Sequence, residues 1–263
     1  MNSGRVPALE LCNVCKTFGG LKATDNISIE VKEHEIYGII GPNGVGKTTL
    51  FNLITGVVPL SSGQIKVFGQ DISNLRADKI CKVGVARTFQ NIRLFNSATI
   101  MENLMIACQQ TIQYSAIQGC LRTKQFRKEE HGAQERCRNI LEKFGLLEYK
   151  DFTASKLPYG SQRRVEIMRA LMTDPKVLLL DEPAAGMNPQ ETLELAEFIR
   201  EIREKFHKTV LLIEHHMDLV MDIADRIYVL DFGELIAQGT PAEIQNNERV
   251  IDAYLGVAED AED

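Results

Sequence analysis

An α/β fold is predicted by the sequence, with a mainly parallel sheet, an N-terminal antiparallel β subdomain and an inserted α-helical lobe. Short apolar runs at 36–40, 177–180 and 210–213 are continuous, which is typical of strands buried on both faces of a parallel sheet. Apolar residues recur at helical spacing over 195–206 and 217–224, so these segments are predicted helices. Strands and helices therefore alternate through the core of the chain.

One domain is expected over residues 1–257, followed by an acidic tail over 258–263. Residues from about 91 to 157 are helix-rich and basic and contain no clear strand pattern. We therefore interpret this stretch as a lobe inserted between two segments of the core, 1–90 and 158–257.

Antiparallel β structure is predicted near both ends of the core. Residues 9–31 contain short alternating stretches around Gly19-Gly20, which favours antiparallel strands. Residues 226–230 and 234–237 flank Asp231-Phe232-Gly233, as expected for a β-hairpin.

Composition and charge argue against several classes of protein. Apolar residues make up 44% and charged residues 25%, as in ordinary globular domains. The net charge of -6 argues against nucleic-acid binding, because surfaces that face phosphates are normally basic. No apolar run reaches the roughly 18 residues that would cross a bilayer, and residues 1–10 do not resemble a secretory signal. We therefore expect a chain that does not itself enter the membrane.

Six cysteines are scattered along the chain, and Cys12 and Cys15 form a C-x-x-C pair. The sequence has no second such pair and no histidine at the spacing of a zinc site. We interpret the cysteines as reduced thiols, with a zinc or redox site as the alternative.

The motif with the clearest chemical meaning is Gly41-Pro-Asn-Gly-Val-Gly-Lys47-Thr48, which matches G-x-x-x-x-G-K-[ST] between a predicted strand and a predicted helix. Glycines let successive backbone N–H groups surround phosphate oxygens, and the helix directs its positive dipole end at the same anion. We expect Lys47 to bind the β- and γ-phosphates and Thr48 to bind Mg²⁺. The motif indicates a P-loop NTPase. The residues expected to contact the nucleotide here are Gly41, Pro42, Asn43, Gly44, Val45, Gly46, Lys47, Thr48 and Thr49.

Polar side chains follow two further predicted strands. The run 177–180 leads into Asp181-Glu182-Pro183, and His215 follows the run 210–213. Ligands of open α/β sheets gather at the carboxyl ends of strands, so three strands deliver polar groups to one edge. We expect Asp181 to hold Mg²⁺ and Glu182 to polarise the attacking water as general base, with a buried structural acid pair as the alternative.

Together these motifs resemble the nucleotide-binding subunits of ABC transporters, over about residues 9–256. The resemblance implies that Gln90, in Arg87-Thr-Phe-Gln90, is the Q-loop glutamine, which reaches Mg²⁺ and the water and reports to the helical lobe. It implies that His215, in Ile213-Glu-His-His216, is the switch histidine. Phe18 matches the aromatic residue that stacks on adenine, and a simple core phenylalanine is the alternative.

Two segments depart from the general family pattern. The signature loop is usually L-S-G-G-Q, whereas this chain has Leu157-Pro-Tyr-Gly-Ser161 before a predicted helix at 162–171. Pro158 replaces the serine and removes its hydroxyl, whereas Gly160 and the backbone N–H groups at the predicted helix start are retained and can bind an anion. The resemblance implies that Tyr159, Gly160 and Ser161 contact the γ-phosphate of a partner subunit. Asn188 stands in the D-loop where many members have aspartate.

These departures are themselves informative. L-P-Y-G-x-Q-R-R, D-E-P-A-A-G-x-N-P, A-R-T-F-Q-N-I-R-L-F and the ending 250–256 are similar to the LivG subfamily of branched-chain amino-acid importers. That resemblance implies ATP hydrolysis that powers import, with ATP and Mg²⁺ as cofactors. It also implies a homo- or heterodimer with a second ATPase subunit, two membrane permease subunits, and a solute-binding protein outside the cytoplasm that is reached through the permease. The chain is then expected to be peripheral, on the cytoplasmic face of the inner membrane.

Other interpretations remain open. The chain could serve another transporter, or an ABC system outside transport, although those systems usually carry two cassettes or long coiled coils. A P-loop kinase or GTPase is disfavoured by Gln90, by His215 and by the lack of an Asn-Lys-x-Asp motif. A catalytically silent subunit is the remaining alternative. The segment 90–104 is unusually apolar, and contact with a permease and core packing are both consistent with it.

Overall fold

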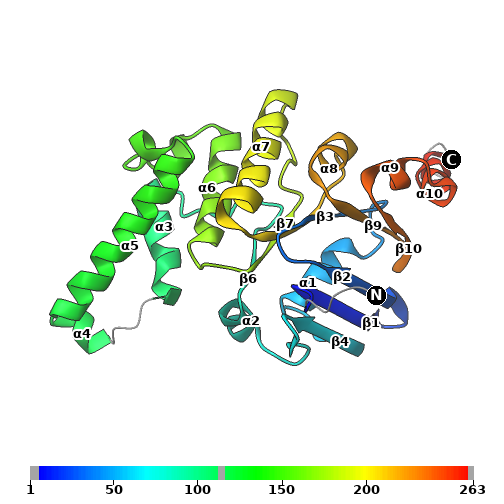
Figure 1. Ribbon diagram of the computed structural model, residues 1–263, viewed down its shortest axis with the longest axis horizontal. Helices are drawn as coiled ribbons and strands as arrows, with labels where there is room; N and C mark the ends of the chain where they lie inside the picture. Colours follow the sequence, from blue (N-terminus) through cyan, green and yellow to red (C-terminus); the bar gives the residue numbers. More distant parts are fainter. Residues whose placement is uncertain (1–5, 112–115, 260–263) are drawn as a thin grey trace. The chain divides into compact units, whose positions relative to one another are not determined.

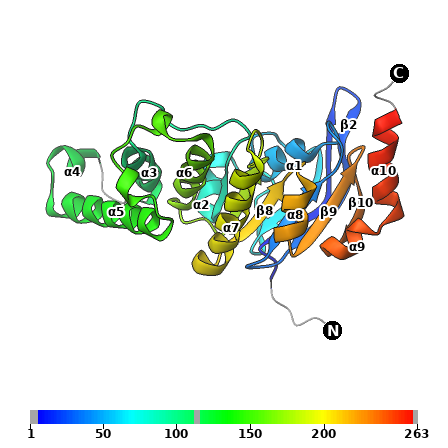
Figure 2. The same ribbon diagram turned by 90° about the horizontal axis from the view of Figure 1, so that it is seen from above.

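The computed structural model describes residues 6–111 and 116–259, which form two compact units (Figures 1 and 2). The first unit contains the chain up to Gln90 and again from Lys176 onward, and the second contains Asn91–Pro175.

A six-stranded sheet with strand order β10-β9-β3-β8-β7-β6 forms the centre of the first unit (Figure 1). All neighbouring strands pair in parallel except β10, which pairs with β9 in antiparallel orientation. Every residue of β3, β7 and β8 is buried, as the continuous apolar runs predict. The strands are β3 (Ile36–Ile40), β6 (Val85–Arg87), β7 (Val177–Asp181), β8 (Thr209–Ile213), β9 (Arg226–Asp231) and β10 (Glu234–Gly239).

The predicted antiparallel β subdomain is a four-stranded sheet with strand order β2-β1-β4-β5. Its first two strands are joined at Gly19-Gly20, where both φ angles are positive, as a tight turn requires. The hydroxyl of Tyr228 on β9 donates to the carbonyl of Glu30 on β2 at 2.5 Å and ties the two sheets together. The strands are β1 (Leu9–Phe18), β2 (Leu21–Val31), β4 (Ser62–Val67) and β5 (Gln70–Asp71).

Helices cover both faces of the larger sheet. Along β3, Tyr37 and Ile39 belong to the core that also includes α1 and the smaller sheet. Gly38 faces the other side, where an added Cβ would lie 2.4 Å from the side chain of Val220 on α8, so glycine permits this close approach. The helices of this unit are α1 (Lys47–Ile54), α2 (Ala77–Val83), α7 (Pro189–Phe206), α8 (Met217–Ile223), α9 (Pro241–Gln245) and α10 (Glu248–Glu259).

The fold class predicted from the sequence is therefore confirmed, down to the bounds of β3. Short elements were not predicted: β4 begins with exposed polar residues, and β6 has only three residues. Of the predicted acidic tail, residues 260–263 lie outside the described residues, and α10 extends to Glu259.

The second unit is a helical lobe in which α3 packs against both α5 and α6. Thr99 begins α3 with a capping box to Glu102, and Cys108 and Cys137 meet between α3 and α5 with their Sγ atoms 3.6 Å apart. Because α6 packs on α3, the compact unit continues to Pro175 instead of ending near residue 157. Its elements are α3 (Ile100–Cys108), η1 (Gln109–Thr111), α4 (Ala116–Cys120), α5 (Lys124–Lys143), η2 (Leu147–Tyr149), η3 (Ala154–Lys156) and α6 (Tyr159–Leu171).

A buried ion pair lies inside this lobe. Arg163 and Glu166, one turn apart on α6, are joined by a 2.7 Å bond and expose 0% and 2% of their side chains. Glu166 also accepts a hydrogen bond from the backbone N–H of Arg93 at 2.8 Å. Burial nevertheless raises the pKa of the Glu166 carboxyl above its usual value.

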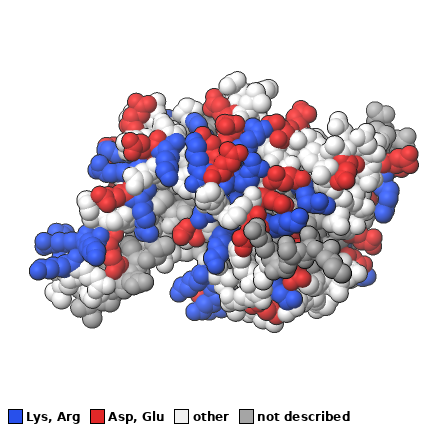
Figure 3. All heavy atoms as spheres, viewed as in Figure 1, with Lys and Arg blue, Asp and Glu red and all other residues white. Residues whose placement is uncertain are grey.

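The surface carries both signs of charge on the face shown in Figure 3. Lysine and arginine side chains gather over the start of α5, where the exposed basic residues are Arg122, Lys124, Arg127 and Lys128. Within the part of the chain that the structure describes, no helix has the length and apolar character needed to span a membrane.

We expect Arg163→Met to lower the free energy of unfolding by about 3–5 kcal/mol, because Glu166 would stay buried without the charge of Arg163. The loss should be smaller at pH 5 than at pH 8, since the buried carboxyl can then take up a proton. Urea denaturation at the two pH values measures both effects. Arg164→Met, on the same helix at a half-buried position, is the matched control and should change stability by less than about 1 kcal/mol. Equal losses in the two variants would contradict a special role for the buried pair.

Candidate functional site

The loop between β3 and α1 can be built only with glycine at its two ends. Gly41 has a φ of 146°, and a Cβ there would lie 2.0 Å from the carbonyl oxygen of Leu230 on β9. Gly46 has a φ of 101°, and its Cβ would lie 2.1 Å from the carbonyl oxygen of Ala23 on β2. The backbone of the loop is therefore pressed between two strands, and any larger residue would displace it.

The start of α1 presents backbone N–H groups without a side-chain cap. Its N-cap residue is Gly46, which has no side chain that could accept their hydrogen bonds. Lys47 is buried at this point and donates to the carbonyl oxygens of Gly41 at 2.7 Å and Pro42 at 2.6 Å. Burial lowers the pKa of Lys47 to about 8, and the negative charges of Glu182 and Asp181 act in the opposite direction. An anion at this place would satisfy both the amides and the ammonium group.

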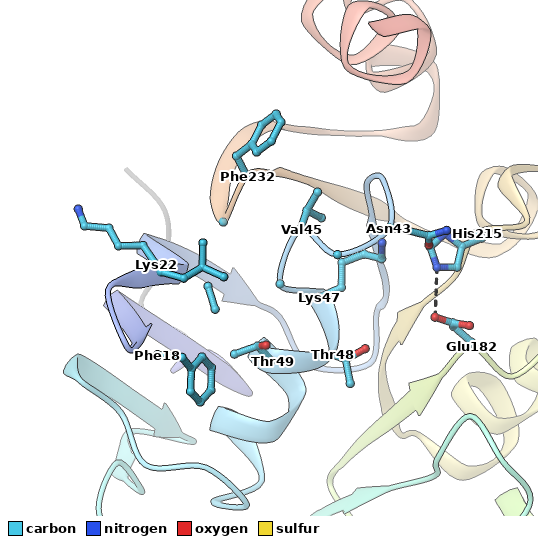
Figure 4. A pocket seen from close by; sticks show the side chains of 15 residues that line it. Phe18, Lys22, Asn43, Val45, Lys47, Thr48, Thr49, Glu182, His215 and Phe232 are labelled. Carbon is cyan, nitrogen blue, oxygen red and sulfur yellow. Dashed lines mark hydrogen bonds and ion pairs between the residues drawn. The ribbon is translucent and has the colours of Figure 1, made fainter. Parts of the chain in front are cut away.

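A cavity of about 510 Å³ lies over this loop (Figure 4). Phe18 lines it and is 47% exposed, so it is not the core phenylalanine of the alternative interpretation. The ammonium of Lys16 lies 4.9 Å from the centre of its ring. The lining residues are Phe18, Leu21, Lys22, Ala23, Asn43, Gly44, Val45, Gly46, Lys47, Thr48, Thr49, Glu182, His215, Phe232 and Gly233.

The carboxylate of Glu182 is held from two sides at the edge of this cavity. His215 Nε2 lies 3.1 Å from Glu182 Oε1, and Gln90 Nε2 donates to Oε2 at 2.7 Å. The backbone of Glu182 has a φ of 46°, in the left-handed region that a non-glycine residue adopts at a cost. The structure thus brings together the three predicted catalytic side chains, which come from the ends of β6, β7 and β8.

Asp181 lies next to Glu182 but is tied to a residue that the sequence analysis did not single out. Its Oδ2 accepts a 2.6 Å bond from Arg87, and both side chains are 5% exposed. Phe232, at the tip of the β9–β10 hairpin, lines the cavity, and the sequence had not indicated a role for it in the site. Phe232 has a φ of 41° and is 86% exposed, which is unusual for a phenylalanine in a turn and could have drawn attention to it.

The oxygen donors around the loop suit magnesium. A threonine hydroxyl (Thr48), a carboxylate (Asp181) and an amide oxygen (Gln90) are hard ligands of the kind that Mg²⁺ takes, together with phosphates and water. Within residues 6–111 and 116–259, no three His, Cys, Asp or Glu side chains gather into a metal-binding cluster. That donor set fits an ion held mainly by phosphate and water, and it does not resemble an all-protein cage.

Comparison with known proteins gives one consistent answer. Residues 24–185 match the family model described as ABC transporter, and residues 234–260 match the model described as branched-chain amino acid ATP-binding cassette transporter. The chain belongs to the ABC transporter family.

Relatives of this cassette match it over nearly their whole length. The high-affinity branched-chain amino acid transport ATP-binding protein LivG of Salmonella typhimurium is 48% identical over 96% of this chain and 99% of its own. The protein BraF of Pseudomonas aeruginosa, described in the same words, is 45% identical over 96% of this chain and 99% of its own. A solved structure of an ATP-binding cassette of an ABC transporter, in its ADP conformation, is 34% identical with a TM-score of 0.83, and it covers 96% of this chain and 100% of the other.

The two departures from the family pattern both fall at helix starts. Helix α6 begins at Tyr159, three residues earlier than predicted, with Pro158 as its N-cap. Tyr159, Gly160 and Ser161 therefore form its first turn, at the positive end of the helix dipole. Asn188 is the N-cap of α7, where its Oδ1 accepts from the N–H of Glu191 at 3.0 Å. Asparagine and aspartate are about equally good N-caps, so the substitution in the D-loop preserves the start of the helix.

Gly46→Ala is expected to cost more stability than Gly44→Ala. Both positions have positive φ, which should cost an alanine roughly 1–2 kcal/mol. The Cβ at position 44 would meet no atom within 4 Å, whereas the Cβ at position 46 would overlap the Ala23 carbonyl. We expect that overlap to add about 1–3 kcal/mol, measured by urea unfolding of the two variants. Equal stability of the two would show that the loop is not confined as described.

ATP binding is expected to draw a proton onto Lys47 at alkaline pH. With a pKa of about 8 in the nucleotide-free protein, the ammonium is largely charged at pH 7 and largely neutral at pH 9. Bound phosphate raises that pKa, so affinity should be flat below pH 7 and fall above pH 8. Calorimetry at pH 8.5, in two buffers of different ionisation enthalpy, measures the proton uptake. An absence of uptake there would contradict the lowered pKa.

Proposed function

We propose that this cassette binds ATP with Mg²⁺ and hydrolyses it to power the import of branched-chain amino acids. The proposal rests mainly on the position of the Glu182 carboxylate. It is held between His215 and Gln90, beside the glycine-rich loop Gly41–Lys47. A carboxylate fixed at the edge of an anion cradle is suited to accept a proton from a water that attacks the last phosphate.

The chain's own residues divide the work of hydrolysis. The amides of the loop and the ammonium of Lys47 hold the phosphates, while Phe18 offers an exposed ring to the adenine. Glu182 accepts the proton of the attacking water, and His215 with Gln90 keeps its carboxylate in place. Bound Mg²⁺, held by Thr48, Asp181 and Gln90, would neutralise charge that develops on the phosphates.

A second ATPase subunit, identical or different, is part of the proposal. The first turn of α6 is formed by Tyr159, Gly160 and Ser161 and lies at the positive end of the helix dipole, which favours an anion. These residues would face the γ-phosphate on a partner in a head-to-tail pair, so each site is completed only on dimerisation. Within each subunit we propose that residues 1–257 act as one ATPase domain.

A surface on the helical lobe is proposed to contact the permease. In the segment 90–104, Leu94 and Ile100 are buried in the lobe, whereas Phe95 is 51% exposed. A cavity of about 480 Å³ is lined nearby by Ser97, Ala98, Glu102, Met105, Ile106, Gln109 and Glu130. We propose that a permease subunit docks here and that the complex contains two such subunits, which connect the cassettes to an external solute-binding protein. The cassette is then peripheral on the cytoplasmic face of the inner membrane.

Branched-chain amino acids are favoured over other cargo by the C-terminal segment. Residues 234–260, which include β10, α9 and α10, match the branched-chain transporter model, and LivG and BraF carry that substrate in their names. An ABC ATPase of another system stays the alternative, because the substrate itself would bind to other subunits.

Glu182→Gln is expected to bind ATP, to hydrolyse it at least about a hundredfold more slowly, and to accumulate as an ATP-bound dimer, because the amide cannot take the proton. Hydrolysis assays and light scattering with ATP measure these effects. In a strain that lacks the gene, the unaltered protein should restore leucine uptake and the Glu182→Gln variant should not. Normal turnover by this variant would remove Glu182 from the role of base, and leucine uptake that does not depend on the gene would point to other cargo.

A further inference from the structure

Arg87 is a buried arginine at the end of β6, three residues before Gln90, and the mechanism above gives it no part. Its Nη2 donates to Asp181 Oδ2 at 2.6 Å, and the side chains of both residues are 5% exposed. The two residues are 94 positions apart in the sequence, so the contact exists only because β6 pairs with β7.

The guanidinium of Arg87 is itself fixed from several sides. Its Nη1 donates to Asn52 Oδ1 at 2.7 Å, and Asn52 belongs to α1, the helix that follows the phosphate loop. The ring centres of Phe51 and Phe89 lie 5.5 and 5.0 Å from the guanidinium carbon. Arg87 therefore has little freedom, and the oxygen of Asp181 that it holds is equally fixed.

Stability alone is a poor explanation for this pair. Replacing a buried ion pair with apolar residues of similar volume is often neutral or stabilising, because burying two charges is costly. The ion pair also leaves one oxygen of the carboxylate able to accept another bond, because Oδ1 of Asp181 has no hydrogen-bond or ion-pair partner among the described residues. Carboxylates that hold metals commonly have a neighbouring group that fixes them in this way.

We propose that Arg87 is a positioning residue for the metal: by holding Oδ2 of Asp181 it presents Oδ1 to the Mg²⁺ that accompanies the nucleotide. The inference rests on the proposed function, because it needs Asp181 to face that ion. The single bond to Oδ2 lets arginine and metal bind the same carboxylate together. Since Arg87 also holds Asn52 on α1, it links the metal carboxylate to the helix that begins at the phosphate loop.

Metal affinity distinguishes this role from two others. A positioning role predicts weaker metal binding when Arg87 is removed. Direct competition between Arg87 and the ion predicts tighter binding. A role in the fold alone predicts lower stability with unchanged metal affinity.

The experiment uses full-length Arg87→Met, whose apolar side chain can pack between Phe51 and Phe89. Unaltered and variant proteins are first saturated with a non-hydrolysable ATP analogue in EDTA and then exchanged into metal-free buffer. Metal affinity is measured by titration with Mn²⁺, followed by paramagnetic resonance, and by titration with Mg²⁺, followed by calorimetry. We expect metal affinity to fall about tenfold in the variant, the lower end of the range for groups that orient metal ligands. Affinity for the analogue in EDTA should stay within about twofold, because no phosphate contact is lost.

Two further variants keep the result interpretable. Arg203→Met removes another arginine–aspartate pair of the same unit, Arg203 with Asp225 at 3.2 Å, and should leave metal affinity unchanged. Asn52→Ala frees the guanidinium without removing its charge and should weaken metal binding about threefold, which tests the proposal even if Arg87→Met fails to fold. Unchanged or tighter metal binding in a folded Arg87→Met, or in Asn52→Ala, would overturn the inference. Failure of the unaltered protein to bind the analogue would instead overturn the proposed function.

Discussion

Parallel pairing of β3, β8 and β7 is the constraint on which the rest of the structure depends. Ile39 on β3 is level with Ile213 on β8, and Ile213 is level with Asp181 on β7. All three strands therefore end at the same edge of the sheet. The phosphate loop, Asp181 with Glu182, and His215 each lie within two or three residues of a strand end at that edge. All three strands are buried on both faces. A shift in the register of any one of them would therefore displace its apolar side chains in the core and, at the same time, the polar residues that follow it at the edge of the sheet.

Several features at this edge are unfavourable by themselves. Lys47 is a buried ammonium with a lowered pKa, Glu182 has a left-handed backbone, and Arg87 and Asp181 are charges withdrawn from water. The large apolar core beneath them, with α1 between the two sheets, keeps them in place. Such local costs, concentrated at one edge of the sheet and supported by ordinary packing elsewhere, are typical of a functional site.

Departures from a family motif can also preserve local structure. Pro158 sits at the N-cap of α6, where its missing N–H costs nothing and the helix begins directly after it. Asn188 forms a capping box with Glu191 as an aspartate would. In both cases the side chain differs while the helix terminus, which is the part that can meet an anion, is retained.

Local signals in the sequence were enough to predict β3, β7 and β8, the hairpin at Asp231–Glu234, the phosphate loop, and the positions of Glu182 and His215 just after strands, because continuous apolar runs and a glycine-rich motif act over a few residues. Tertiary structure alone decided that β6 joins the sheet, that α6 belongs with the helical lobe, and that Arg87 holds Asp181. These features depend on contacts between segments far apart in the chain. A three-residue strand or a single buried arginine carries too little pattern of its own to reveal such a contact.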